Sequence, residues 1–154
     1  MDKEEAKNST LGTKIVSNEA HYFYPFSINP QAYKGFVELG VTEGYTEADY
    51  VEFKQAALTA ATAYATNAKE GCENEFALFV ETKEETYLPC LDEYIGFKKG
   101  EGKNTITLGA IPSILENMGS GILSAEVYYN PYTTEIPEKI AGAEYFNIFI
   151  QKRI

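Results

Sequence analysis

Few side chains in this sequence have the type and spacing that catalysis requires. His21 is the only histidine, and it lies in an expected strand beside Tyr22 and Phe23, where packing is a more common role than proton transfer. The one Gly-x-Ser-like cluster, GSG at 119–121, follows an expected helix rather than the strand that precedes a nucleophile elbow. Cys72 and Cys90 lack the spacing and the histidine partners of a zinc site. The sequence therefore predicts a protein that is not an enzyme and that uses no cofactor or metal.

Positively charged side chains concentrate in one short polar segment. Lys98, Lys99 and Lys103 lie in KKGEGKN, which we expect to be a flexible loop. Such a loop is a usual position for contacts to phosphate, and an ordinary solvated loop has the same composition, so both interpretations stay open. Asn67 and Lys69 stand in NAKEGCEN, which joins an expected helix to an expected strand beside a glycine turn.

Aromatic side chains alternate near the start of the chain, at Tyr22, Tyr24 and Phe26. If they are exposed, these rings can stack on nucleobases or form a surface that docks onto a protein. Alternating aromatic residues in a strand are more often part of a core. The pattern thus makes these three residues candidates for protein docking and leaves the core interpretation open.

The overall charge limits the range of partners. The chain has 13 Lys and Arg against 23 Asp and Glu, a net charge of −10, which argues against tight autonomous binding of nucleic acid. The charged N-terminus is not a secretory signal, and no stretch is apolar enough to span a membrane. We expect a cytoplasmic protein with free thiols, no membrane partner and no small-molecule substrate.

Hydrophobic periodicity predicts the elements that would position these residues. Residues 1–12 read as a flexible leader, and 13–154 as a single domain. The strongest helix signal spans about 47–67, where Thr46 and Asp49 form a box-like N-terminal pair and the periodic apolar face is rich in alanine. Shorter helices are expected at 31–39 and at 111–118, each ended by a glycine. Expected strands are listed in chain order: Thr13–Ile28, Glu75–Thr82, a weaker segment at Tyr87–Phe97, Ile122–Tyr129 and Tyr145–Ile150.

This order of elements predicts an α+β fold, with helices on one face of a mostly antiparallel sheet. A chain of 154 residues is long enough for one domain with its own core.

Five segments, taken in order, resemble a known family. They are HYFYPFSINP (21–30), YTEADYVEFKQAAL (45–58), NAKEGCENEFALFVE (67–81), YLPCLDEYI (87–95) and VYYNP (127–131). Together they are similar to the C-terminal half of the crRNA-binding backbone subunit of type I CRISPR Cascade, the Cas-seven family, and most similar to its type I-B members. The resemblance covers about residues 9–136.

The resemblance implies an RRM-like, ferredoxin-like partial fold that binds RNA and protein without catalysis. Its implied partners are Cascade subunits and crRNA, together with self-association. Relatives often carry an Arg-Ser-Lys-like triplet where this chain has Asn67, Ala68 and Lys69, so only the lysine is kept. Because a full backbone subunit is about twice as long, the resemblance also implies an exposed sheet edge or apolar surface on this chain.

Three hypotheses follow from the resemblance. The chain is a component of a type I CRISPR complex, or an anti-CRISPR-like inhibitor from a phage or mobile element that mimics the backbone subunit and blocks type I-B Cascade. The third hypothesis is a truncated backbone subunit without an independent function. The net charge and the altered triplet favour contact with protein over contact with RNA.

Overall fold

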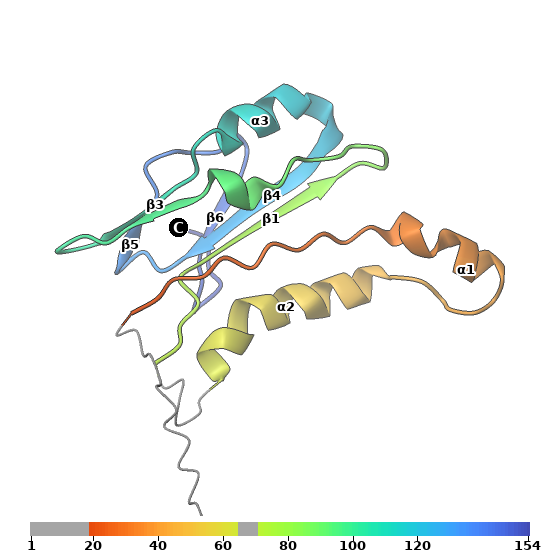
Figure 1. The fold of residues 1–154 in the computed structure, drawn as a ribbon, viewed down its shortest axis with the longest axis horizontal. Coiled ribbons are helices and arrows are strands. Elements are labelled where there is room, and N and C mark those ends of the chain that lie inside the picture. The colour runs from red at the N-terminus through yellow and green to blue at the C-terminus, as the bar shows by residue number, and fades with distance from the viewer. Residues whose placement is uncertain (1–18, 65–70) are drawn as a thin grey trace, which may run out of the picture.

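A computed structural model describes residues 19–64 and 71–154 (Figure 1). The expected leader, the first part of the predicted Thr13–Ile28 strand, Asn67 and Lys69 all lie outside the described residues. The α-helices are α1 (Lys34–Glu38), α2 (Glu47–Ala63) and α3 (Ile111–Met118). The 3-10 helices are η1 (Pro30–Tyr33), η2 (Leu91–Tyr94) and η3 (Gly119–Gly121). The strands are β1 (Phe76–Thr82), β2 (Gly96–Lys98), β3 (Asn104–Thr107), β4 (Ile122–Tyr129), β5 (Thr134–Glu135) and β6 (Glu144–Asn147).

The described strands form two three-stranded sheets, ordered β1-β4-β6 and β2-β3-β5. In the first, β1 and β4 pair antiparallel over their whole length, and β6 joins β4 in parallel. In the second, β2 and β3 form an antiparallel hairpin, and β5 joins β3 in parallel. The mixed, mostly antiparallel architecture confirms the predicted α+β class and is consistent with a partial ferredoxin-like fold.

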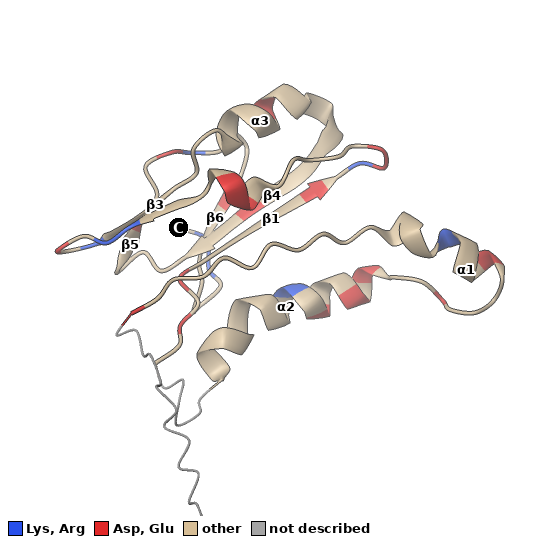
Figure 2. Ribbon diagram, in the orientation of Figure 1, with Lys and Arg blue, Asp and Glu red and all other residues tan. Residues whose placement is uncertain are grey.

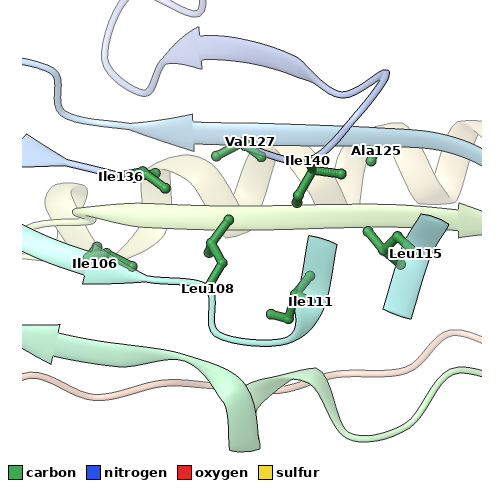
Figure 3. Packing of buried hydrophobic residues seen from close by; sticks show 8 residues of the cluster. All are labelled: Ile106, Leu108, Ile111, Leu115, Ala125, Val127, Ile136 and Ile140. Atoms are coloured by element: carbon green, nitrogen blue, oxygen red, sulfur yellow. The ribbon is translucent and has the colours of Figure 1, made fainter. Parts of the chain in front are cut away.

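Alternating side chains of the β1-β4-β6 sheet enter two separate cores. The larger core collects Leu78 and Val80 of β1 with Ala125 and Val127 of β4. Side chains of β3, of α3 and of the segment after β5 complete this core; those that are fully buried include Ile106, Leu108, Ile111, Leu115, Ile136 and Ile140 (Figure 3). Helix α3 and the second sheet therefore cover one face of the first sheet.

The smaller core lies on the opposite face, under α2. It consists of Leu58 from α2, Phe79 from β1, Tyr128 from β4, and Ile148. Both faces of the sheet are thus covered, whereas the sequence led us to expect helices on one face. The difference arises because β1 is apolar at every position from Phe76 to Val80, so neither of its faces can be left to water.

Local signals located several elements accurately. Helix α3 and strand β4 have the bounds that the sequence predicted, and Gly119 ends α3 with a φ of +51°. At the start of α2, the Thr46 hydroxyl accepts a hydrogen bond from the Asp49 backbone N–H. The Asp49 carboxylate accepts one in return from the Thr46 backbone N–H, which completes a capping box. The carboxylate's hydrogen bonds lower the pKa of Asp49, because they stabilise its charged form.

The predicted first strand is wrong over its described part. Residues 20–28, which we call the strap, are extended but belong to no sheet. Pro25 has no N–H to donate to a ladder, and the strap is held instead by side chains at two points. In Figure 1 it runs between α2 and β1.

Three other expectations need correction. Helix α2 ends at Ala63 rather than near 67, because Tyr64 is already extended and the Asn74 N–H donates to the Thr62 hydroxyl of the last turn. The weak Tyr87–Phe97 segment contains η2 and only the start of β2. The last strand stops at Asn147, whose side-chain oxygen accepts hydrogen bonds from the next turn.

No helix among residues 19–64 and 71–154 has the length and apolar content that crossing a bilayer demands.

Candidate binding surface

The three lysines predicted to contact phosphate lie on the β2–β3 hairpin. Lys98 is the last residue of β2, and Lys99 and Lys103 stand in the turn that leads to β3. The turn depends on Gly100, because a Cβ at this position would collide with the carbonyl oxygen of Lys103. Figure 2 shows positive and negative charges together at the end of this hairpin, and in the sequence Glu101 lies between Lys99 and Lys103.

The environments of the three lysines differ. Lys99 forms an ion pair with Glu19, and Lys103 Nζ donates a hydrogen bond to the carbonyl oxygen of Pro131 at 2.5 Å. Lys98 is exposed, and its side chain makes no hydrogen bond or ion pair with any described residue. Of the three, Lys98 is the cation most available to an anionic partner.

His21 attaches the strap to this hairpin. Its ring stacks on Phe97 of β2, with 3.7 Å between the centroids and 21° between the planes. The ring nitrogens face two carboxylates, Nδ1 at 2.6 Å from Glu75 Oε2 and Nε2 at 3.1 Å from Glu19 Oε1. The half-buried histidine therefore has the packing role that its sequence context predicts, and it brings the strap beside the lysines.

The predicted aromatic residues follow on the strap, and the structure separates them into two kinds. Tyr22 and Tyr24 are 74% and 83% exposed, with ring centroids 6.5 Å apart. Phe26 packs edge-on against Phe53 of α2, with 4.6 Å between centroids, and lies 6.0 Å from Phe79. The two tyrosines are thus free to contact a partner, while Phe26 mainly holds the strap in place.

A polar network that we did not predict positions the hairpin. Asn104 at the start of β3 donates from Nδ2 to Glu75 Oε1 at 3.4 Å. Asn130, which is 5% exposed, donates from Nδ2 to Glu73 Oε1 at 3.1 Å and accepts a hydrogen bond from the Tyr132 N–H at 3.0 Å. The signal was present in the sequence, since Glu73 and Glu75 lie in the third of the five family-like segments and Asn130 in the fifth.

Sequence analysis also missed a groove of about 310 Å³ between α2 and the sheet. Three carboxylates line it, those of Glu47, Glu81 and Glu126, with one cation, Lys54. Lys54 Nζ is 2.6 Å from Glu126 Oε2 and 5.4 Å from the centroid of the Phe79 ring. The groove is therefore acidic and already contains one of its own cations.

Two tyrosines border this groove. Burial raises the pKa of Tyr50 well above its usual range, and the nearby carboxylates, Glu81 first, raise it further. Burial also raises the pKa of Tyr128, whose hydroxyl donates to Glu126 at 2.7 Å. Both hydroxyls are thus protonated donors.

Within residues 19–64 and 71–154, no three His, Cys, Asp or Glu side chains are grouped closely enough to hold a metal ion.

The comparison with protein families identifies a match over much of the chain. The family model for CRISPR-associated protein Cas7 matches residues 1–107 of the 154-residue chain, a region that contains the strap, α2, β1 and the β2–β3 hairpin. No curated protein and no solved structure matches the chain. Because the family model spans more than half of the sequence, the chain belongs to the CRISPR-associated Cas7 family.

Proposed function

We propose that this protein is a non-catalytic, CRISPR-associated binding protein that docks onto the subunits of a type I effector complex, Cascade. Membership of the Cas7 family supports the association with CRISPR. The order of the five family-like segments supports the finer assignment, to the C-terminal half of a type I-B backbone subunit.

The observation that carries this proposal is an apolar arm, residues 33–41, that projects from the body of the molecule (Figure 1). The arm comprises α1 and its flanking residues, and its large side chains are exposed. These are Tyr33 (49%), Phe36 (53%), Val37 (42%), Leu39 (78%) and Val41 (71%). A run of exposed apolar side chains on a projecting element is typical of a surface that another protein covers.

Contact with crRNA is the second part of the proposal. The hairpin lysines and the exposed rings of Tyr22 and Tyr24 lie at the same end of the molecule because His21 stacks on Phe97. Cations with neighbouring aromatic faces suit single-stranded RNA. Because Lys99 is already paired with Glu19, the contact with crRNA is the weaker of the two proposed contacts.

A co-purification experiment tests the docking. Tagged protein expressed in a type I-B host should recover Cascade subunits and crRNA. The double variant Phe36→Ser, Leu39→Ser should reduce recovery about tenfold, because it removes two apolar contacts from the arm. The matched control is Leu123→Ser, since Leu123 is 59% exposed but lies on β4. Recovery of no Cascade subunit by the unmodified protein would reject the proposal.

A second candidate function is inhibition, in which the protein occupies a docking surface of type I-B Cascade without holding the guide RNA. The net charge of −10 favours it, because an acidic molecule is poorly suited to retain RNA. Expression in a type I-B host that carries a matching spacer should then increase phage plaque formation. A component of the complex would leave plaque formation unchanged or reduce it.

A further inference from the structure

The β1-β4-β6 sheet has two edges, and the described residues pair with only one of them. At the β6 edge, the C-terminal residues form a bridge between Phe146 and Arg153, and the Ile154 N–H donates to the Tyr145 carbonyl at 2.9 Å. At the β1 edge, no hydrogen bond from the described residues reaches the backbone between Ala77 and Glu81 apart from the ladder with β4. Alternate N–H and C=O groups of β1 therefore point away from the sheet without a partner among residues 19–64 and 71–154.

The composition of β1 makes this edge prone to pairing. The strand reads FALFVET and is apolar on both faces over its first five residues. Only Phe79 is fully buried, and the other six residues are half-buried. A long apolar edge strand with unpaired backbone groups is a template for another strand.

The strap lies beside this edge without pairing with it. Its two anchors contact β1 at its start and at its middle, since His21 binds Glu75 just before the strand and Phe26 lies against Phe79. Between these anchors the strap carries Pro25 and two exposed tyrosines. A covering segment and a proline are both means by which proteins protect an open edge.

The edge is also complementary to itself in one antiparallel register. In a sheet formed by two copies of β1, directly opposed residues must point to the same face. The twofold axis therefore has to lie between the two copies of one residue of β1, and that residue defines the register. An axis at Leu78 would oppose Glu75 with Glu81, and an axis at Val80 would oppose Phe79 with Glu81. An axis at Phe79 instead opposes Glu75 with Lys83 at both ends and Leu78 with Val80 between them, and Glu81 then faces only the small side chain of Ala77.

We propose that the open edge of β1 is a self-association site that the strap keeps closed. When the strap is released, two copies pair antiparallel through β1 with the axis at Phe79, which joins two three-stranded sheets into one. The inference concerns β1 and the strap alone, so it stands or fails separately from docking onto Cascade through the apolar arm.

Removing both anchors tests the closed state. The release variant His21→Gln, Phe26→Ala should show a concentration-dependent doubling of mass by light scattering. At the same concentration, amides of residues 76–82 should exchange with deuterium more slowly than in the unmodified monomer. Tyr24→Ala is the matched control, because it alters the same segment at a side chain that anchors nothing. Circular dichroism shows whether the release variant keeps its fold.

Charge reversal in the release background tests the register. Lys83→Glu alone should raise the dimer dissociation constant about tenfold, because it opposes two glutamates at each end, and Glu75→Lys alone should do the same with two lysines. The double reversal should restore the original constant. Because His21 is already replaced in this background, Glu75→Lys breaks no strap anchor. It also removes the hydrogen bond from Asn104 Nδ2, but the double reversal removes that bond as well, so its recovery isolates the effect of the opposed charges.

Two results would overturn the proposal. One is a folded release variant that stays monomeric and keeps the deuterium exchange of the unmodified protein. The other is a dimer whose dissociation constant does not respond to Lys83→Glu, because such a dimer uses another surface or another register.

Discussion

At the scale of single residues, the groove under α2 contains the groups with the most altered ionisation. The hydroxyls of Tyr50 and Tyr128 are partly removed from water and lie beside carboxylates, so losing a proton there would create a second negative charge in a poorly hydrated site. The pKa of each hydroxyl is therefore raised above the ordinary value of 10.0. Lys54 compensates one carboxylate, Glu126, directly.

This shift predicts how stability depends on pH. Above pH 10.0 the two hydroxyls ionise in the unfolded chain but keep their protons in the folded one. The folded state then binds more protons, so the free energy of unfolding should fall as pH rises above that value, while below it the stabilisation is fully present. Urea unfolding from about pH 8 to about pH 11 measures the dependence.

Single hydroxyl deletions provide the control for this measurement. Tyr50→Phe and Tyr128→Phe should each make the alkaline loss of stability shallower. Tyr132→Phe should leave it unchanged, because Tyr132 is 74% exposed. An alkaline slope that is the same in all three variants would mean that other groups cause it.

At the scale of elements, α2 is attached to the sheet by a narrow stripe. Leu58 is its one buried residue. Ala57 precedes it, Lys54 and Ala61 lie about one turn to either side, and the half-buried Tyr50 and Phe53 continue the stripe toward the start of the helix. The capping box of Thr46 and Asp49 stabilises the first turn of the helix, but much of the helix surface faces water. Its position therefore depends on the smaller core more than on its own propensity.

A pair of substitutions on α2 tests this dependence. Leu58→Ala should lower the free energy of unfolding by about 2–3 kcal/mol, because it leaves a cavity against Phe79 and Tyr128. Val51→Ala, at a position that is 57% exposed on the same helix, should change it by less than about 0.5 kcal/mol. Urea unfolding followed by circular dichroism measures both values, and equal effects would contradict the packing described for α2.

At the scale of the whole molecule, the net charge of −10 opposes the local positive charge of the hairpin. Three lysines and Glu101 occupy the turn and its border, and Glu19 neutralises Lys99. The field around the molecule therefore does not attract RNA strongly, and only short-range contact at the hairpin and the strap remains.

Salt dependence of RNA binding makes this quantitative. Three phosphate contacts to a single strand would give a slope of about −2 in a plot of log K against log salt, so we expect a slope no steeper than that. Fluorescence anisotropy of a labelled single-stranded RNA provides the measurement. Lys98→Gln should flatten the slope, whereas Lys34→Gln on α1 should not. A much steeper slope would show that cations outside the hairpin grip the RNA.

The sequence by itself determined the elements whose signals are local. The bounds of α3 and β4, the capping box of α2 and the hairpin loop all follow from residues within a few positions of one another. The family-like segments were also readable in order, and the family match covers four of the five. Periodicity, capping and turn chemistry act over one or two turns of chain, so no distant contact was needed.

Only the tertiary structure decided which extended segments pair and which polar residues meet. The strap has strand-like composition but forms no ladder, and the short β5 exists only because Asn104 and Thr105 lie beside it in space. The Glu73–Asn130 and Glu75–Asn104 contacts likewise join residues far apart in the chain. Pairing and burial depend on which partner arrives from a distance, and local composition carries no information about that partner.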